Sequence, residues 1–307
     1  MDRLRNVLVA TDLSSDSVSA LRQGARVAGL CGADLHVLHV VRDDAAGAMR
    51  EFIGEAEPAP DEGWRRAAEE QVRAELAGNG IEGVASARAV VGNPIREILA
   101  ATRAVEADLL VVGASGASGK RMLGTTAVRC VRKAPTKVLV VPTGSDGRFL
   151  RTLACVDFSP LSPVVMMQAA RMGHLDGGEV SAVHCYQMPW NQARWGPPPR
   201  NAVELEERFR MELRRRYESV LLPHAHGHRV ALHARSHGNY GEGIVEYARL
   251  IGADLVVLGT TGRTALATML LGTTAEKVMR DVGCAVLAVK LPGEGSGVGE
   301  PMGMGRG

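Results

Sequence analysis

The sequence repeats itself with a period of about 145 residues, and this repeat limits the possible folds more than any other feature. Asn6–Ser14 reads NVLVATDLS and Leu153–Ser159 reads LACVDFS, so each half begins with an apolar run that ends in Asp, an apolar residue and Ser. Later runs correspond in the same order: LHVLHVV with VSAVHCY, DLLVVG with DLVVLG, and KVLVVP with AVLAVK. The chain therefore contains two copies of one folding unit.

Both copies have the pattern of an α/β fold. Their apolar runs are uninterrupted, which is typical of parallel strands that are covered on both faces. Stretches with helical spacing or composition separate the runs: Ser15–Cys31, Glu62–Ala77, Pro94–Ala104, Ala202–Leu222 and Gly243–Leu250. We therefore expect two tandem Rossmann-like doubly wound domains, each with a five-stranded parallel sheet.

The polar stretch 143–148, TGSDGR, separates the last strand of the first copy from the first strand of the second. We place the first domain at residues 1–145 and the second at residues 146–292, and the short connection predicts that they touch. Residues 293–307 are rich in glycine and cannot form a core, so we expect a disordered tail there.

Composition and charge argue against several classes of partner. The 36 Lys and Arg residues nearly balance the 34 Asp and Glu residues, which gives no electrostatic reason to expect a nucleic acid or an anionic membrane surface. No apolar run reaches the roughly 18 residues of a membrane span, and no signal-peptide core follows the first residues. The five cysteines are scattered and form no CxxC, which favours reduced core thiols. We expect a cytoplasmic protein.

Glycines mark the end of the fourth strand in each copy. In the second copy Gly259 and Gly262 are followed by nine residues and then by Gly272-Thr273-Thr274, which opens a helix. Glycines let backbone N–H groups approach a phosphate, and a helix N-terminus adds unpaired donors and a favourable dipole. Open α/β sheets bind ligands at the carboxyl ends of their strands, near the switch in strand order. This segment is therefore a candidate phosphate-binding loop.

The G-x2-G-x9-G-[ST] pattern from Gly259 to Thr273, with VDFS and DLVVLG before it, resembles the ATP-binding pattern of universal stress proteins, and the resemblance covers both copies to about Lys290. It implies an adenine nucleotide such as ATP, with or without Mg²⁺, and a role in stress response or signalling. It also implies that the two copies pack about a pseudo-two-fold axis, as single-domain members do in their dimers. A homodimer of the whole chain is compatible with this arrangement.

The resemblance assigns positions of this sequence to the ligand. Asp157 would contact the adenine or ribose end, Cys185 would stand at the adenine wall, and the glycines and threonines would hold ribose and phosphates. The residues implied for the second site are Asp157, Cys185, Gly238, Gly259, Gly262, Gly272, Thr273 and Thr274. Those implied for the first site are Asp12, Val40, Gly92, Gly113, Gly116, Gly124, Thr125 and Thr126.

Each copy departs from the family pattern in its own way. Only seven residues separate Gly116 from Gly124, so the first loop is two residues short. We expect the shortening to pull the helix start toward the strand or to tighten the loop across the phosphate position, so that the second site dominates. The second copy has Cys185 where the first has Val40, and it lacks a counterpart of Pro94.

Two other functions stay open. The same fold could serve as an interaction module with empty sites, which the short first loop would permit. A zinc-dependent hydrolase is the weaker alternative. In an extended segment His224, His226 and His228 would share a face and could bind zinc, with His233 and His237 nearby. Because histidine-rich turns are usually solvated, we assign no metal site.

Rapid nucleotide hydrolysis has no support in the sequence. Ala114–Arg121, ASGASGKR, lacks the first glycine and the last hydroxyl of a Walker A loop, and no acid and base stand at catalytic spacing. We assign no catalytic residue and expect at most very slow hydrolysis of ATP. His39 and His184 lie within strand-like runs, so we expect them to be hydrogen-bonded core residues and not ligands.

Overall fold

The computed structural model describes residues 4–42, 61–114, 123–191, 197–261 and 271–291. The first half contains β1 (Asn6–Thr11), α1 (Ser15–Cys31), β2 (Asp34–Arg42), α3 (Asp61–Gly78), β3 (Ser86–Gly92), α4 (Pro94–Ala104), β4 (Leu109–Gly113), α5 (Thr125–Lys133) and β5 (Lys137–Val141). The second half contains β6 (Arg151–Cys155), α6 (Ser162–Asp176), β7 (Glu179–Tyr186), η1 (Pro189–Asn191), α7 (Ala202–Arg216), the π-helical turn η3 (Tyr217–Leu221), the 3₁₀ turn η4 (Leu222–Ala225), β8 (Ala231–Ser236), α8 (Tyr240–Ile251), β9 (Leu255–Gly259), α9 (Thr273–Asp281) and β10 (Ala285–Val289).

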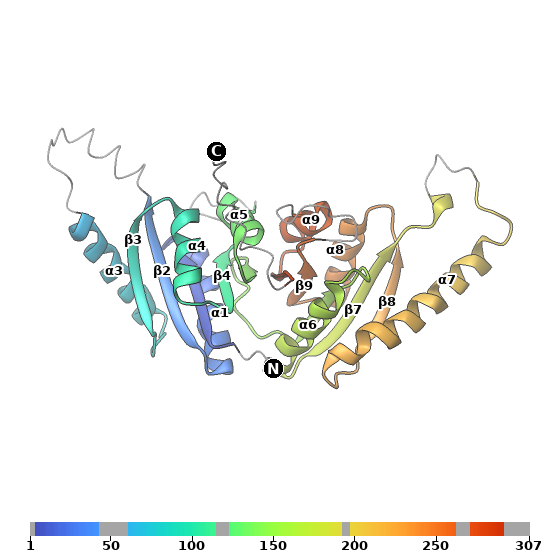
Figure 1. Cartoon of the computed structure of the whole chain (residues 1–307), viewed down its shortest axis with the longest axis horizontal. Coiled ribbons are helices and arrows are strands. Elements are labelled where there is room, and N and C mark those ends of the chain that lie inside the picture. The colour runs from blue at the N-terminus through green and yellow to red at the C-terminus, as the bar shows by residue number, and fades with distance from the viewer. Residues whose placement is uncertain (1–3, 43–60, 115–122, 192–196, 262–270, 292–307) are drawn as a thin grey trace, which may run out of the picture.

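The strands form one ten-stranded sheet with helices on both faces (Figure 1). Its order is β3-β2-β1-β4-β5-β10-β9-β6-β7-β8, and neighbouring strands run parallel within each half. The α/β prediction with two Rossmann-like halves is confirmed. The structure adds that the two parallel sheets are continuous with each other.

The seam between the halves is the pair β5–β10, which is antiparallel, with Leu139 opposite Leu287. Antiparallel pairing of equivalent strands is what a two-fold axis through the seam requires. The halves therefore form a pseudo-dimer within one chain, and in Figure 1 they rise from the seam as the two arms of a V.

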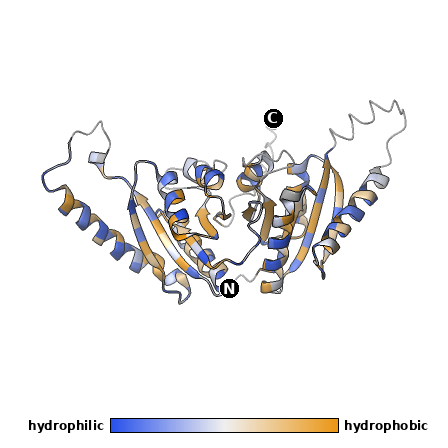
Figure 2. Cartoon of the chain, turned by 180° about the vertical axis from the view of Figure 1, so that it is seen from behind, coloured by the Kyte–Doolittle hydropathy of each residue, from blue (hydrophilic) through white to orange (hydrophobic). Residues whose placement is uncertain are grey.

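The core lies in two layers, one on each face of the sheet. Alternate residues of a strand enter opposite layers, so Val7 and Val9 pack with α1 and α3 while Leu8 packs with α4 and α5. Each layer continues across the seam into the second half. Figure 2 shows strands that are largely apolar and helices that mix apolar and polar residues.

Local sequence explains where several helices end. Gly32, Gly177 and Gly252 follow α1, α6 and α8 with φ of 59°, 66° and 60°, the left-handed conformation that glycine adopts without a steric penalty. The predicted bounds of α1 and α4 are confirmed. The predicted helix Ala202–Leu222 is shorter, because α7 gives way to the π-helical turn at Tyr217.

Three further expectations concern the whole chain. Cys31, Cys130, Cys155, Cys185 and Cys284 are all free thiols. Among the helices that the structure describes, none is long and apolar enough to cross a membrane. The predicted tail 293–307 lies outside the described residues.

Candidate functional site

The candidate site of each half lies where the strand order reverses. β1 has β2 on one side and β4 on the other, and β6 has β7 and β9, so a crevice for ligands is expected at the carboxyl ends of these strands. Asp12 directly follows β1, and Asp157 follows β6 after one further residue. The strands pair Thr11 with His39 and Cys155 with Val183, and the same registers continued by one and two residues bring Val40 level with Asp12 and Cys185 level with Asp157.

The aspartates sit in tight, strained loops. The residues after them, Leu13 and Phe158, have φ of 58° and 60°, which is unfavourable for a bulky side chain. Oδ1 of Asp157 accepts hydrogen bonds from Ser159 N at 2.9 Å and from Ser162 Oγ at 3.0 Å. The loop geometry thus orients the carboxylate at the edge of the sheet in both halves.

A histidine ties each loop to the neighbouring strand. His39 Nδ1 lies 2.9 Å from Thr11 O, and His184 Nδ1 lies 2.8 Å from Val156 O, so both rings bond the carbonyl just before the aspartate. The expectation of hydrogen-bonded strand histidines is met. Their link to the site was missed, although each stands 27 positions after its aspartate in the repeat.

The two glycine loops are closed by the same bonds. Ala114 N donates to Val141 O at 2.9 Å and Gly124 N donates back to Ala114 O at 2.7 Å. Thr260 N donates to Val289 O at 3.0 Å, and Gly272 N donates to Thr260 O at 2.9 Å. In each half the same two backbone hydrogen bonds therefore join the residue after the strand to the neighbouring strand and to the start of the helix.

The shorter first loop does not displace its helix start. Gly124 has φ −66° and ψ 146°, and Gly272 has φ −63° and ψ 141°. Of the two expected effects of the shortening, a pull of the helix toward the strand is wrong, because the closing hydrogen bonds hold both helix starts alike. The other effect, a tighter loop across the phosphate position, falls on residues outside the described part of the chain. The difference of two residues falls within the loops, where Gly116 and Gly262 lie outside the described residues.

The two described glycines of the second loop serve different purposes. A Cβ on Gly259 would come within 2.5 Å of Leu161 Cδ2, so the chain itself requires glycine there and brings the end of β9 against the Asp157 loop. A Cβ on Gly272 would meet only Thr260 O, at 3.6 Å. Neither φ nor packing among the described residues requires a glycine at position 272. Thr273 is exposed and Thr274 half-buried at the same helix start.

The wall beside each aspartate differs between the halves. Val40 is half-buried in β2, and Cys185 takes the corresponding place in β7, where burial raises the pKa of its thiol to about 11. A Cβ on Gly243 would lie 3.0 Å from Cys185 Sγ and 2.9 Å from His237 Cβ, so these two side chains are close neighbours. His237 is a second residue near the site that sequence reasoning did not assign.

The loops after β3 and β8 start helices in the same way. Asn93 Oδ1 accepts from Arg96 N at 3.3 Å, and Asn239 Oδ1 accepts from Glu242 N at 3.2 Å. These asparagines cap α4 and α8, and Gly92 and Gly238 precede them at the carboxyl edge.

The histidine cluster of the second half does not form the extended strip that zinc binding would need. His224 lies in η4 and His226 has φ 49°, so the segment turns. His228 packs its ring against His174, and His233 packs against Tyr247. Among the described residues no group of three potential metal ligands comes together.

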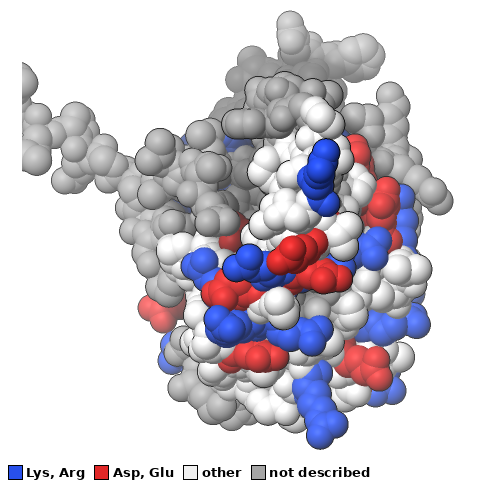
Figure 3. Space-filling view, turned by 90° about the vertical axis from the view of Figure 1, so that its right-hand side faces the viewer, with Lys and Arg blue, Asp and Glu red and all other residues white. Residues whose placement is uncertain are grey.

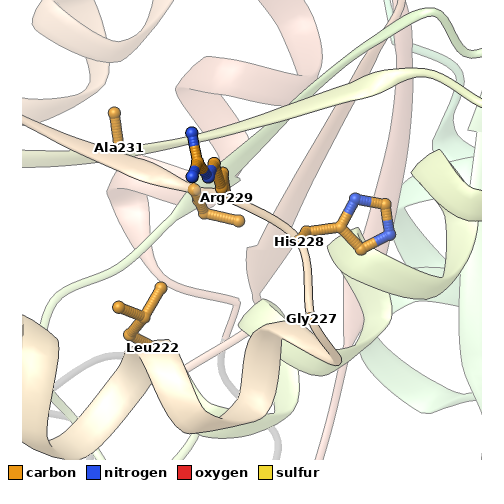
Figure 4. A pocket seen from close by; sticks show the side chains of 6 residues that line it. Leu222, Gly227, His228, Arg229 and Ala231 are labelled. Atoms are coloured by element: carbon orange, nitrogen blue, oxygen red, sulfur yellow. The ribbon is translucent and has the colours of Figure 1, made fainter.

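A hollow of about 470 Å³ lies at the start of β8, at the opposite edge of the sheet from the Asp157 loop. In Figure 4 Leu222 rises from its helical turn below the extended segment that carries His228, Arg229 and Ala231. The side of the molecule that carries α7 shows interspersed basic and acidic side chains (Figure 3). Arg215 and Glu212 of α7 form an ion pair at 3.1 Å. Neither feature adjoins the residues assigned to the ligand.

Known proteins share this fold over the whole chain. A protein of unknown function from Pseudomonas aeruginosa PAO1 superposes with a TM-score of 0.67 at 20% identity, covering 95% of this chain and 94% of its own. A universal stress protein from Archaeoglobus fulgidus superposes with a TM-score of 0.62 at 19% identity, covering 93% and 98%.

Sequence relatives match a shorter segment at higher identity. A universal stress protein of Methanocaldococcus jannaschii is 53% identical over 49 residues, which span 16% of this chain and 29% of that protein. A universal stress protein E homolog of Haemophilus influenzae is 51% identical over 49 residues, or 16% of each chain. The model of the universal stress protein family matches residues 3–142 and again residues 148–290. The chain therefore belongs to the universal stress protein family and carries two of its domains in tandem.

Proposed function

We propose that this protein binds an adenine nucleotide such as ATP at the carboxyl edge of its sheet, with the second half as the dominant site. The observation that carries the proposal is the pairing of an oriented aspartate with a glycine-started helix on adjacent strands at the strand-order switch. Binding and not rapid turnover is the proposed activity, because we assign no general base and no Walker lysine.

The start of α9 suits a phosphate group. The first N–H groups of a helix have no intrahelical partner, and the N-cap Gly272 has no side chain to satisfy them. The space that a Cβ on Gly272 would occupy is open to a ligand oxygen among the described residues. The hydroxyls of Thr273 and Thr274 are additional donors. A magnesium ion would enter with the phosphates, as is usual for this cation.

The Asp157 loop suits the nucleoside end. Both hydrogen bonds to the carboxylate end on Oδ1, and among the described residues Oδ2 accepts none, so it is available to a ribose hydroxyl or the adenine amino group. Cys185, level with Asp157, supplies an apolar surface for the base. In the first half Asp12 and Val40 occupy the same positions.

Calorimetric titration of the full chain with ATP and GTP tests the proposal. We expect tighter binding of ATP, and we expect Asp157→Ala to weaken it by about 1–3 kcal/mol, the cost of an unpaired polar group. Asp12→Ala is the matched control in the first half and should matter less. GTP binding as tight as ATP binding, or an unchanged affinity in Asp157→Ala, would contradict the assignment. Absence of any nucleotide binding would favour the interaction module.

The proposal also limits turnover. ATP hydrolysis measured by phosphate release should stay far below the roughly 1 per second of an ordinary enzyme. Faster turnover would mean that a catalytic group has been overlooked.

A further inference from the structure

We infer that His184 is a positioning residue for the Asp157 loop, and that His39 has the same role for the Asp12 loop. The inference rests on the proposed function, since it concerns how the nucleotide-contacting carboxylate is held. Neither histidine is assigned to contact the ligand.

The peptide group before Asp157 is held at both ends. Its carbonyl, Val156 O, accepts from His184 Nδ1 at 2.8 Å, and its N–H, on Asp157, donates to Ser162 Oγ at 3.1 Å. A peptide group fixed at both ends cannot rotate, so the direction in which the Asp157 side chain leaves the backbone is fixed as well.

The Asp157 loop is strained and needs such support. Phe158 has φ 60°, a conformation that costs a residue with a Cβ of order 1–3 kcal/mol and persists only where its surroundings impose it. The His184 ring lies edge-on to the Phe158 ring at 5.0 Å between centroids, and the histidine is only 7% exposed. One buried side chain therefore contacts both the carbonyl before Asp157 and the side chain after it.

The histidine contact recurs in the other half. His39 bonds Thr11 O, the carbonyl before Asp12. Leu13, which corresponds to Phe158, also has a positive φ, 58°, although one side chain is aliphatic and the other aromatic. In the first half a hydroxyl supports the strained residue itself: Thr11 Oγ1 accepts from Leu13 N at 3.1 Å and lies 2.8 Å from Ser17 Oγ, whereas in the second half the Ser162 hydroxyl contacts Asp157. Val156 stands in place of Thr11 and has no hydroxyl. The second loop should therefore depend more on its histidine than the first.

The chemistry of the contact shows how to test it. A carbonyl oxygen only accepts, so Nδ1 of His184 carries the proton. In His184→Asn the amide nitrogen can take the place of Nδ1 and restore the donor, whereas His184→Leu fills the space without one. Both variants lose the imidazole ring, but only His184→Leu loses the hydrogen-bond donor, so comparing them separates the effect of the hydrogen bond from that of the ring.

The first measurement needs no nucleotide. Hydrogen exchange of the free protein should show the amides of Asp157 and Ser159 exchanging about tenfold faster in His184→Leu than in the wild type, with His184→Asn near the wild type. The matching variants His39→Leu and His39→Asn should show a smaller difference at the Asp12 loop. Equal protection in His184→Leu and the wild type would overturn the inference, whether or not ATP binds.

The second measurement is calorimetric titration of the same variants with ATP. We expect Kd to rise about tenfold in His184→Leu and to recover in His184→Asn, because a lost hydrogen bond to a buried acceptor corresponds to about that factor. Equal weakening in both variants would overturn the inference in favour of ring packing. If the wild type binds no ATP, the proposed function fails, while the exchange result still decides the positioning role. If His184→Leu does not fold, the comparison of His184→Asn with the wild type decides the positioning role. Weaker hydrogen-exchange protection of the Asp157 loop in His184→Asn would then contradict the inference, because the asparagine amide should replace the lost donor.

Discussion

The neighbours of each glycine in the second glycine loop determine whether a larger residue can replace it. Gly259 packs against Leu161, whereas a Cβ on Gly272 would meet only Thr260 O among the described residues, at an ordinary contact distance of 3.6 Å, although both are glycines of the same motif. A motif match alone would treat them as equivalent. The structure separates a glycine that the fold requires from one that only a ligand would require.

This difference predicts opposite outcomes for two matched substitutions. Gly259→Ala should destabilise the protein by about 1–3 kcal/mol, because its Cβ would overlap Leu161 at 2.5 Å. Gly272→Ala should leave the free energy of unfolding nearly unchanged, while Gly272→Val should abolish most ATP binding in a folded protein. Urea unfolding and calorimetric titration measure the two effects. A stable Gly259→Ala would contradict the packing role of Gly259, and ATP binding by Gly272→Val would contradict the ligand role of Gly272.

Buried thiols predict a loss of stability in alkali. Burial raises the pKa of Cys130 to about 12 and that of Cys284 to about 12, against an ordinary value of 9.0. The unfolded chain releases these protons first, so the free energy of unfolding should fall as the pH rises from about 9 toward 12. Urea unfolding at several pH values measures the slope, and Cys130→Val should make it shallower. The same slope in that variant would assign the effect to other groups.

At the scale of elements, short polar signals set where helices start. The side chains of Asn93 and Asn239 each accept a hydrogen bond from the third residue of their helix, whereas Asn201, at the same position before α7, makes no such bond. Asn93 and Asn239 are extended, with ψ of 118° and 116°, whereas Asn201 has ψ of 24°.

The caps give a prediction with an internal control. Asn93→Ala and Asn239→Ala should each lower the free energy of unfolding by about 1 kcal/mol, because a helix N–H loses its acceptor. Asn201→Ala should change it by less than about half of that. Thermal or urea unfolding of the three variants is sufficient. An equal loss in Asn201→Ala would show that the caps do not account for the difference.

At the scale of the whole molecule, a buried ion pair joins the halves beside the seam. Arg26 Nη1 of α1 donates to both carboxylate oxygens of Asp176 at 2.6 and 2.8 Å, and Phe149 N donates to the same carboxylate at 2.7 Å. The Arg26 guanidinium also lies 4.8 Å from the centre of the Phe149 ring. The position of Asp176 in the repeat corresponds to Cys31 in the first half, so the carboxylate of this pair is not repeated there.

Breaking this pair should cost more than breaking an exposed one. The Asp176 side chain is 4% exposed, so Asp176→Ala leaves a largely buried guanidinium without its partner and should destabilise the protein by about 3–5 kcal/mol. Glu212→Ala is the control, since its pair with Arg215 is 64% and 81% exposed and should contribute less than about 1 kcal/mol. Urea unfolding compares them. Similar losses in both variants would exclude a special role for the inter-half pair.

Much of the candidate site was visible in the sequence because it follows local signals. Uninterrupted apolar runs, the Asp-x-Ser turns and the glycine spacing placed Asp157, Gly259 and Gly272 at strand ends and a helix start, where the structure has them. The bond from His184 to Val156 O was not visible, because a histidine within an apolar run gives no sign of which carbonyl it faces. Nor was it visible that the first helix start stays in place, since loop length alone does not reveal the hydrogen bond that closes the loop.

The sequence by itself determined the repeat, the α/β class, most helix and strand positions and the family resemblance. These depend on periodicity, turn chemistry and motif spacing, which act over a few neighbouring residues. Only the tertiary structure decided that β5 pairs with β10 and that Arg26 meets Asp176, 150 positions away. Such contacts depend on how distant segments pack together, because an apolar strand such as KVLVV can pair with any strand of similar character until shape and buried charge select one partner.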